Sequence, residues 1–461
     1  MNGTRFRVPR RRFLAASAAA AVGIPYWHTA AARGAAWQES RPKIGCIGVG
    51  GQGLAIARSA ARFGEILAVC DADLRHAQAA REALGDQAAV YQDYRELLAR
   101  DDVEVVLNGT PDHWHTPINI AACRAGKDIY TEKPLTLTIE EGKLLCDVVR
   151  QTGRIVQVGT QQRSDRAYQL AVELVRNGRL GQLRQVWVAL PYFSAKGGPF
   201  EAEPVPAELD WDLYQGQAPE HPYCRQRTHS DYRWWYEYAG GIITDWGNHH
   251  YDIAHWGMDC ERTGPVSVEA RGLFPNGGRP QHYNTPDRFF ARMEYANGVE
   301  LLYFASLGER LHYGAVDGHV DTTPAEAEWL FGADTDEEIK TFSRNGVMFI
   351  GERGRIFVNR GGVYGRPVEE LEENPLPDDA WRAPASLDHM ANFFECVATG
   401  EQPVSTVEVQ HRTITACHLT NISLQLEQEL TWDPEQEVIV GNSEARARQS
   451  RVPRTPYSLE G

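Results

Sequence analysis

The chain has 461 residues, of which 42% are hydrophobic and 24% are charged, a composition typical of folded globular proteins rather than disordered ones. This length exceeds that of one ordinary hydrophobic core, so we expect two domains. The net charge of −15 argues against nucleic acid and anionic membrane surfaces as partners, because both are negatively charged. None of the eight cysteines forms a CxxC pattern, and we expect buried thiols rather than disulfides or a zinc site.

The first 36 residues have the order of an export signal. The stretch "RRRFL" (Arg10 to Leu14) is followed by a short alanine-rich apolar run and by small residues, Ala30 to Ala32, that fit a cleavage site. The apolar run is too short to span a membrane. We therefore predict a twin-arginine signal and arm over residues 1–36, with an exported, periplasmic protein free of the membrane after cleavage. The alternative is a disordered basic tail.

Residues 37–162 alternate between apolar strands and helix-period segments. "KIGCIGVGGQGLAIARSAARF", "GEILAVCDADLRHAQAAREALG" and "VEVVLNGTPDHWHTPINIAACRAG" each follow this order. The alternation predicts a parallel sheet covered by helices on both faces, an α/β domain of the Rossmann type.

The first strand leads into "GVGGQG", which matches the GxGxxG fingerprint, and Asp71 ends the next strand. Glycines allow a tight turn, and the following helix offers free N–H groups to a pyrophosphate. A carboxylate at residue 71 accepts from ribose hydroxyls and repels a 2′-phosphate, so NAD is favoured, while Arg75 leaves NADP possible. The predicted dinucleotide contacts here are Gly48, Gly50, Gly51, Gln52, Gly53 and Asp71.

Two later strand ends carry polar motifs. In "TPDHWHTPIN" we expect Thr110, Pro111 and His115 to line the nicotinamide pocket, while Trp114 fits either the core or the floor of a substrate site. In "TEKP" (Thr131 to Pro134) the sheet presents Glu132 and Lys133 at its carboxyl edge. Both are predicted to lie beside the cofactor.

Residues 163–461 show a different sequence pattern. Alternating β-type runs such as "LRQVWVALPYF" and "RFFARMEYANGVELLYFASL" are joined by glycine turns, and "YANG" is typical of a tight hairpin. They predict a largely antiparallel sheet. Residues 200–235 are expected to form loops, and two segments near the C-terminus are expected to form amphipathic helices.

The stretch "GGIITDWGNHHYDIAHW" begins at Gly240. If residues 243–257 form a helix, Asp245 and His249 share one narrow face, while His250 and His255 point elsewhere. Metal ligands must converge, so we predict no metal here.

The glycine fingerprint, Glu-Lys-Pro and "GGIITDWGNHHYD" together resemble the Gfo/Idh/MocA oxidoreductases, a family that includes glucose–fructose oxidoreductase and inositol dehydrogenase. The resemblance implies an N-terminal Rossmann domain and a C-terminal α/β domain with a large, mostly antiparallel open sheet that often mediates oligomers. It also implies a homodimer or homotetramer, and catalysis by Lys133, Asp245 and His249.

The chemistry expected is oxidation of a secondary alcohol of a sugar or polyol. His249, near a helix N-terminus that disfavours imidazolium, takes the proton, and Lys133 stabilises the developing alkoxide. Asp252 is expected to support His249. Further candidates for substrate contact are Arg163, Arg233 and Tyr236.

Export has a consequence for the cofactor, because NAD is not expected to circulate outside the cytoplasm. An exported enzyme has to hold it tightly and carry it through the membrane. The first hypothesis is therefore a sugar or polyol oxidoreductase with tightly held NAD(P). The alternative is a glycoside-cleaving enzyme that oxidises, eliminates and re-reduces. A binding-only module is a third reading.

Overall fold

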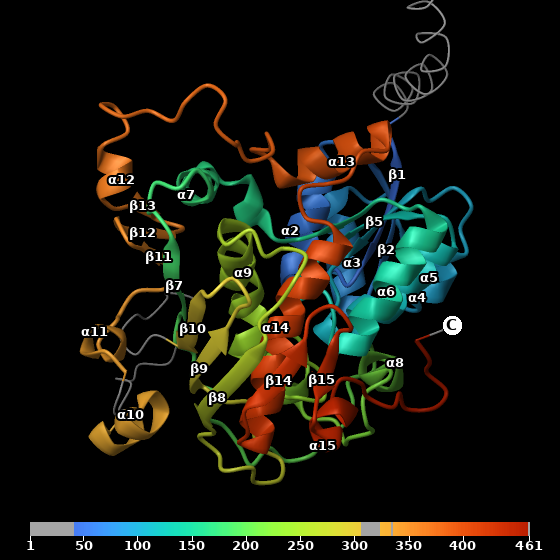
Figure 1. Cartoon of the computed structure of the whole chain (residues 1–461). Helices are drawn as coiled ribbons and strands as arrows, with labels where there is room; N and C mark the ends of the chain where they lie inside the picture. Colours follow the sequence, from blue (N-terminus) through green and yellow to red (C-terminus); the bar gives the residue numbers. More distant parts are fainter. Residues whose placement is uncertain (1–40, 306–322, 333–334, 460–461) are drawn as a thin grey trace, which may run out of the picture.

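The computed structural model describes residues 41–305, 323–332 and 335–459, which form two sheets with their covering helices (Figure 1). The predicted export signal over residues 1–36 lies outside these residues.

The first sheet is parallel and six-stranded, with the order β3-β2-β1-β4-β5-β6. Its strands are β1 (Lys43–Ile47), β2 (Glu65–Cys70), β3 (Ala89–Tyr91), β4 (Val105–Asn108), β5 (Asp128–Thr131) and β6 (Val156–Val158). The helices between them are α2 (Gly51–Ala60), α3 (Leu74–Leu84), α4 (Tyr94–Leu98), α5 (Asp112–Arg124) and α6 (Ile139–Thr152). All of β4 is buried, as expected of a central strand covered on both faces. Strand β3 was not predicted, because its three half-buried residues, Ala89–Tyr91, are too few to give a recognisable strand pattern.

The second sheet is nine-stranded, with the order β13-β12-β11-β7-β10-β9-β8-β14-β15. Its strands are β7 (Leu183–Leu190), β8 (Ser267–Leu273), β9 (Arg288–Glu294), β10 (Glu300–Ala305), β11 (Gly346–Gly351), β12 (Gly354–Asn359), β13 (Gly362–Tyr364), β14 (Leu430–Asp433) and β15 (Val438–Val440). Among the described strands of this sheet, only β7 and β10 pair in parallel, so the prediction of a mostly antiparallel sheet is confirmed. Gly298 turns the β9–β10 hairpin at a φ of 80°.

Helices after the first sheet are α7 (Arg166–Arg176), α8 (Trp211–Gln215), α9 (Ile242–Gly257), α10 (Pro324–Phe331), α11 (Glu337–Lys340), α12 (Arg366–Glu369), α13 (His389–Thr399), α14 (Val407–Leu426) and α15 (Ser443–Ala447). Short 3₁₀ turns cover η1 (Gln161–Ser164), η2 (Arg225–Arg227) and η3 (Asp231–Trp234). The predicted loop region 200–235 holds only α8, η2 and η3.

Helix α14 joins the two halves of the molecule. It runs between α6 of the first half and both α9 and β8 of the second (Figure 1). Because it has neighbours on several sides, most of its residues are buried, and the prediction of an amphipathic helix is wrong for this segment. None of the helices in the described ranges is long and apolar enough to cross a bilayer.

Helix α13 packs on the first sheet although it lies far along the chain. Phe393 belongs to the same buried cluster as Ile44 and Val105, and its ring centroid is 5.8 Å from that of Tyr130. The boundary expected at residue 162 therefore separates the two sheets, but not all of the helices that cover them.

Candidate active site

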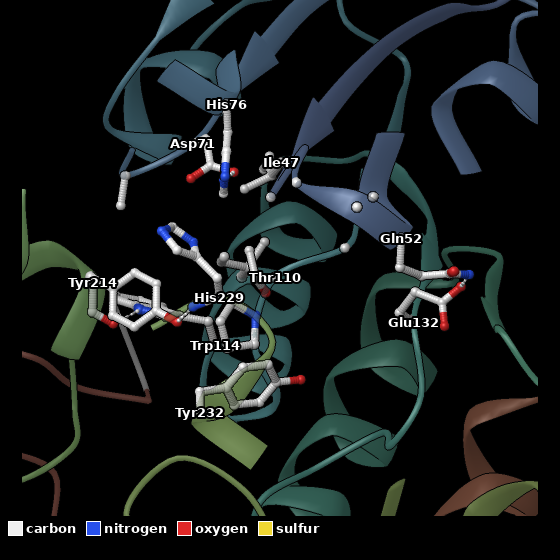
Figure 2. A pocket seen from close by; sticks show the side chains of 18 of the residues that line it. Ile47, Gln52, Asp71, His76, Thr110, Trp114, Glu132, Tyr214, His229 and Tyr232 are labelled. Carbon is white, nitrogen blue, oxygen red and sulfur yellow. Dashed lines mark hydrogen bonds and ion pairs between the residues drawn. The ribbon is translucent and has the colours of Figure 1, made fainter. Parts of the chain in front are cut away.

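A deep pocket lies at the carboxyl ends of the first sheet, where ligands bind in open α/β folds. One wall consists of the glycine loop after β1, Asp71 after β2 and Thr110 after β4. The facing wall comes from the second half of the chain and includes Tyr214, His229 and Tyr232 (Figure 2). The pocket therefore lies between the two halves of the molecule.

The glycine loop is shaped to receive a phosphate group. Gly48 has a φ of 72°, and a Cβ on it would lie 2.5 Å from the backbone nitrogen of Thr110. A Cβ on Gly53 would lie 1.7 Å from the carbonyl oxygen of Gly48. Helix α2 begins at Gly51 without a side-chain cap, so its first N–H groups face the pocket free for an anion. The loop thus fits the pyrophosphate of a dinucleotide.

Asp71 stands at the ribose end of this loop. Its carboxylate accepts hydrogen bonds from the backbone nitrogens of Val49, at 3.0 Å, and Asp73, at 2.9 Å. Each carboxylate oxygen can accept more than one hydrogen bond, so capacity remains for ribose hydroxyls. Arg75 is bound to Asp73, with Nη2 2.6 Å from Oδ2, and does not line the pocket. The negative charge of Asp71 is therefore not offset by Arg75, which favours NAD over a 2′-phosphorylated cofactor.

Three polar side chains meet at the other end of the loop. Glu132 Oε1 accepts from Gln52 Nε2 at 3.1 Å and from Gln161 Nε2 at 3.2 Å. Glu132, Gln52 and Thr110 line the pocket as predicted, and so does Pro111. This arrangement offers hydrogen-bonding groups to the nicotinamide half of the cofactor.

Lys133 forms an ion pair with Asp245 across the two halves of the molecule. Lys133 Nζ lies 2.5 Å from Asp245 Oδ1, and Arg233 Nε lies 3.5 Å from Asp245 Oδ2. Burial alone would raise the pKa of Asp245, but Lys133 and then Arg233 hold that pKa below its usual value. All three side chains line the pocket, so the carboxylate stays ionised beside two cations.

His249 lies one helical turn after Asp245 on α9, as the helical spacing predicted. Its side chain is buried, with the residue 7% exposed, and Nδ1 has no hydrogen-bond partner among the described residues. Burial, and then the charge of Lys133, lower the pKa of His249 well below its ordinary value. The ring is therefore neutral, as a proton acceptor must be. His249 itself does not line the pocket that holds Lys133 and Asp245.

The other histidines of α9 diverge from this site. His250 Nε2 lies 3.4 Å from Asn345 Oδ1, and His255 Nε2 lies 2.7 Å from the hydroxyl of Tyr295. Burial lowers the pKa of each to about 3. They tie α9 to neighbouring elements.

Two of the predicted substrate contacts, Arg163 and Tyr236, and the predicted supporting residue Asp252 lie outside the pocket. Arg163 is 4% exposed and binds Asp252 through Nε and Nη2 at 2.7 Å each, because its guanidinium turns into the core toward that carboxylate. Asp252, expected to support His249, is thus occupied by Arg163. Tyr236 donates to Asn421 Oδ1 at 3.0 Å and lines a different cavity.

His115 is 1% exposed and lies behind the pocket wall. Its ring nitrogens are 2.6 Å from the carbonyl oxygen of Pro134 and 2.8 Å from that of Thr110. His115 therefore links two strand ends that carry pocket residues, rather than lining the pocket. Trp114 is nearly buried in the core cluster and also lines the pocket, and its indole donates to the carbonyl of Leu213 at 3.0 Å.

Several pocket residues escaped the sequence analysis: His76, Tyr214, His229 and Tyr232, together with Asp112 behind them. Three of these lie within the aromatic-rich segment before α9, and that composition was the only local signal. His229 holds a φ of 54°, unusual for a residue with a side chain, and its backbone N–H donates to the Tyr214 hydroxyl at 2.9 Å.

Asp73, His76 and His229 place ligand-type atoms within 4.8 Å of one another. Both oxygens of Asp73 already accept from the guanidinium of Arg75. The cluster is thus satisfied as a hydrogen-bonded group, and we assign no metal to it.

The segment before α9 is fastened to the first half of the molecule. The backbone of Leu74 donates to the carbonyl of Glu208 at 3.0 Å, and that of Asp210 donates to the carbonyl of Ala72 at 2.9 Å. Between them, Asp73 and Leu209 form an antiparallel bridge.

The Rossmann sheet, phosphate-binding loop and Lys133–Asp245 pair define an oxidoreductase that uses NAD. Family models agree: residues 42–160 match "Oxidoreductase family, NAD-binding Rossmann fold", and residues 188–305 match "Oxidoreductase family, C-terminal alpha/beta domain" of Gfo/Idh/MocA proteins. The scyllo-inositol 2-dehydrogenase (NAD(+)) of Bacillus subtilis is 30% identical over 316 residues, covering 68% of this chain and 73% of that protein. The chain belongs to the Gfo/Idh/MocA oxidoreductase family.

Other relatives match over less of their length or only in fold. An inositol 2-dehydrogenase of Salmonella typhimurium is 33% identical over 144 residues, 30% of this chain and 43% of that protein. An alpha-N-acetylgalactosaminidase of Shewanella oneidensis is 32% identical over 151 residues, 31% of this chain and 33% of that protein. The solved levoglucosan dehydrogenase, in complex with NADH and levoglucosan, shares the fold with a TM-score of 0.57 and 18% identity, covering 87% of this chain and 100% of that one.

Proposed function

We propose that the protein oxidises a secondary hydroxyl of a sugar or polyol, with NAD as hydride acceptor, and reduces the ketone in the reverse direction. The observation that carries this proposal is the Lys133–Asp245 ion pair, with Nζ and Oδ1 2.5 Å apart, at the nicotinamide end of the dinucleotide pocket. The scyllo-inositol 2-dehydrogenase relative, which matches over most of its length, supports the substrate class.

In this proposal, different residues stabilise charge on the substrate oxygen and accept its proton. Bound NAD supplies the hydride acceptor. Lys133 stabilises the negative charge that develops on the substrate oxygen. Asp245 and Arg233 fix the position of Lys133 and offer hydrogen-bonding groups to neighbouring hydroxyls. His249, held neutral by burial and by Lys133 and lying one helical turn after Asp245, is the proposed final acceptor of the proton released in the oxidation.

The test begins with the nucleotide released when the purified protein is denatured, which we expect to be NAD. The loaded protein is then mixed with scyllo-inositol, myo-inositol, levoglucosan and common aldoses while NADH absorbance is followed. NADH formation with one of them, or its reoxidation by an added ketose, supports the proposal. Release of NADP, or no redox change with any polyol or sugar, contradicts it.

A glycoside-cleaving cycle is the second candidate, and the local match to the Shewanella alpha-N-acetylgalactosaminidase favours it. In that cycle a hydroxyl is oxidised transiently, the glycosidic bond is eliminated, and the product is re-reduced. Release of p-nitrophenol from p-nitrophenyl glycosides without net NADH formation would select this candidate. Chromogenic glycosides left intact would exclude it.

We further propose that residues 1–36 direct export and that the enzyme works as a homodimer or homotetramer. The arginine cluster and apolar run support export, and the family resemblance supports an oligomer. A reporter fused after residue 36 should appear in the periplasm and stay in the cytoplasm when Arg11 and Arg12 are both changed to lysine. Light scattering on the purified protein gives the oligomeric state, and a monomer would contradict the proposal.

A further inference from the structure

A buried carboxyl group lies directly behind the substrate end of the pocket. Asp112 begins α5, is 3% exposed, and accepts a hydrogen bond from the hydroxyl of Tyr232 at 2.6 Å. Tyr232 belongs to η3, on the other half of the molecule, and lines the pocket. Figure 2 places Tyr232 beyond Trp114, at the opposite end from Asp71 and His76. Neither residue has a role in the chemistry proposed above.

The charged groups that face Asp112 come from three elements: Asp245 of α9, Lys133 after β5 and Arg233 of η3. Burial raises the pKa of Asp112 to about 7, although Tyr232, Lys133 and Arg233 oppose that rise. By contrast, Asp245 is held ionised at this end of the pocket, and His249, which does not line the pocket, is held neutral. Asp112 is therefore the carboxyl group here that changes charge near neutral pH.

The hydrogen bond between these residues fixes what Tyr232 can offer a ligand. A phenol has one proton to donate and lone pairs with which to accept. While Asp112 is ionised it can only accept, so the proton of Tyr232 is committed to it. For a ligand that reaches it, the oxygen of Tyr232 is then an acceptor only, and its natural partner is a hydroxyl group. When Asp112 is protonated, it can donate a hydrogen bond to the oxygen of Tyr232. The hydroxyl proton of Tyr232 is then no longer committed to Asp112 and can point toward another acceptor.

We propose that Tyr232 binds a substrate hydroxyl as a hydrogen-bond acceptor and that Asp112 is the positioning residue that keeps it in that role. The inference rests on the proposed oxidation of a sugar or polyol. The pair then acts in substrate specificity, because a substrate needs a second hydroxyl, besides the one that is oxidised, at the position that meets Tyr232.

The first test compares Tyr232→Phe with the wild type, using scyllo-inositol and levoglucosan as substrates. The substitution keeps the ring and removes the acceptor. The KM should rise roughly tenfold with kcat nearly unchanged, as for loss of one hydrogen bond that does not change in the transition state. Tyr168→Phe is the matched control, since the hydroxyl of Tyr168 is buried without a partner among the described residues. An unchanged KM in Tyr232→Phe would overturn the inference.

The second test is the pH profile of kcat/KM for Asp112→Asn. In the wild type we expect kcat/KM to fall as the pH drops below about 7, the pKa to which burial raises Asp112. Asp112→Asn should lose that fall, because the amide does not titrate. Glu141→Gln is the matched control: burial also raises the pKa of Glu141 to about 7, but Glu141 accepts from the backbone of Leu137, away from the pocket. If kcat/KM of Asp112→Asn still falls below about pH 7 as in the wild type, the inference is contradicted.

The two proposals fail in different ways. If the wild type oxidises a polyol but neither variant behaves as described, the function stands and the Tyr232–Asp112 inference falls. If the wild type oxidises none, binding of scyllo-inositol is measured through the fluorescence of bound NADH. Weaker binding to Tyr232→Phe would then support the inference without the proposed reaction, and equal or absent binding would reject it.

Discussion

Lys133 and Asp245 lie 112 residues apart in the chain, yet their side chains meet with Nζ 2.5 Å from Oδ1. The pair joins the end of strand β5 to the first turn of helix α9, so it forms only when the two halves of the molecule are docked. The charged group proposed to act in catalysis, Lys133, is thus held in place by a contact that depends on how the two halves pack together.

Replacing Lys133 by methionine should leave cofactor binding intact and lower kcat by roughly two to four orders of magnitude, because charge on the substrate oxygen is no longer stabilised. NADH formation in single-turnover experiments measures the loss. Lys143→Met is a suitable control, since Lys143 lies on α6 and pairs with Glu140 outside the pocket. A turnover within a factor of a few of wild type would argue against the assigned role of Lys133.

His249→Ala should keep NAD and lose turnover by roughly two to four orders of magnitude, since the proton acceptor is gone. The nucleotide content of the purified variant shows whether the pocket is intact. His250→Gln serves as comparison, because His250 contacts Asn345 instead of the site and should retain turnover per folded molecule. A folded, fully active His249→Ala enzyme would reject His249 as the base.

Gly53→Ala should abolish NAD binding, because the added Cβ would lie 1.7 Å from the carbonyl oxygen of Gly48 and push the loop out of shape. Calorimetric titration with NAD measures the loss. At Gly51 an added Cβ meets nothing within 4 Å, so Gly51→Ala should unfold at the temperature of the wild type. Wild-type affinity in Gly53→Ala would contradict the loop geometry.

Asp71→Ser should weaken the binding of NAD. It should also lower the ratio of NAD affinity to NADP affinity by roughly tenfold or more, the equivalent of about 1.4 kcal/mol. The cause is loss of the carboxylate that accepts from the ribose and repels a 2′-phosphate. Affinities for both nucleotides, measured at one ionic strength, give the ratio. An unaltered ratio would show that another group sets the preference.

Arg163→Ala should lower the free energy of unfolding by about 3–5 kcal/mol, because the buried carboxylate of Asp252 loses its cationic partner and keeps only neutral donors such as Gln410. Urea denaturation measures the change. Turnover per folded molecule should stay near that of wild type, since Arg163 does not line the pocket. A selective rise in KM without loss of stability would restore Arg163 as a substrate contact.

Much of the fold and the cofactor end of the pocket could be predicted from sequence, because the signals are local. The glycine loop directly follows an apolar strand, and Asp245 and His249 are four residues apart on one helix. The facing wall of the pocket could not, since Tyr214, His229 and Tyr232 come from a segment with no helix or strand periodicity. Arg163 was misplaced because its position after β6 indicates the sheet edge, while its direction is set by Asp252, 89 residues away.

The backbone bridge between Asp73 and Leu209 also bears on how fast the enzyme exchanges its nucleotide. The bridge and its two flanking hydrogen bonds hold the segment that carries Tyr214 and His229 over the adenosine half of the pocket. Departure of the adenosine on this side requires that those bonds break together. The dissociation rate of NAD should thus follow the local opening of this segment, which backbone hydrogen exchange at Leu74 and Asp210 reports.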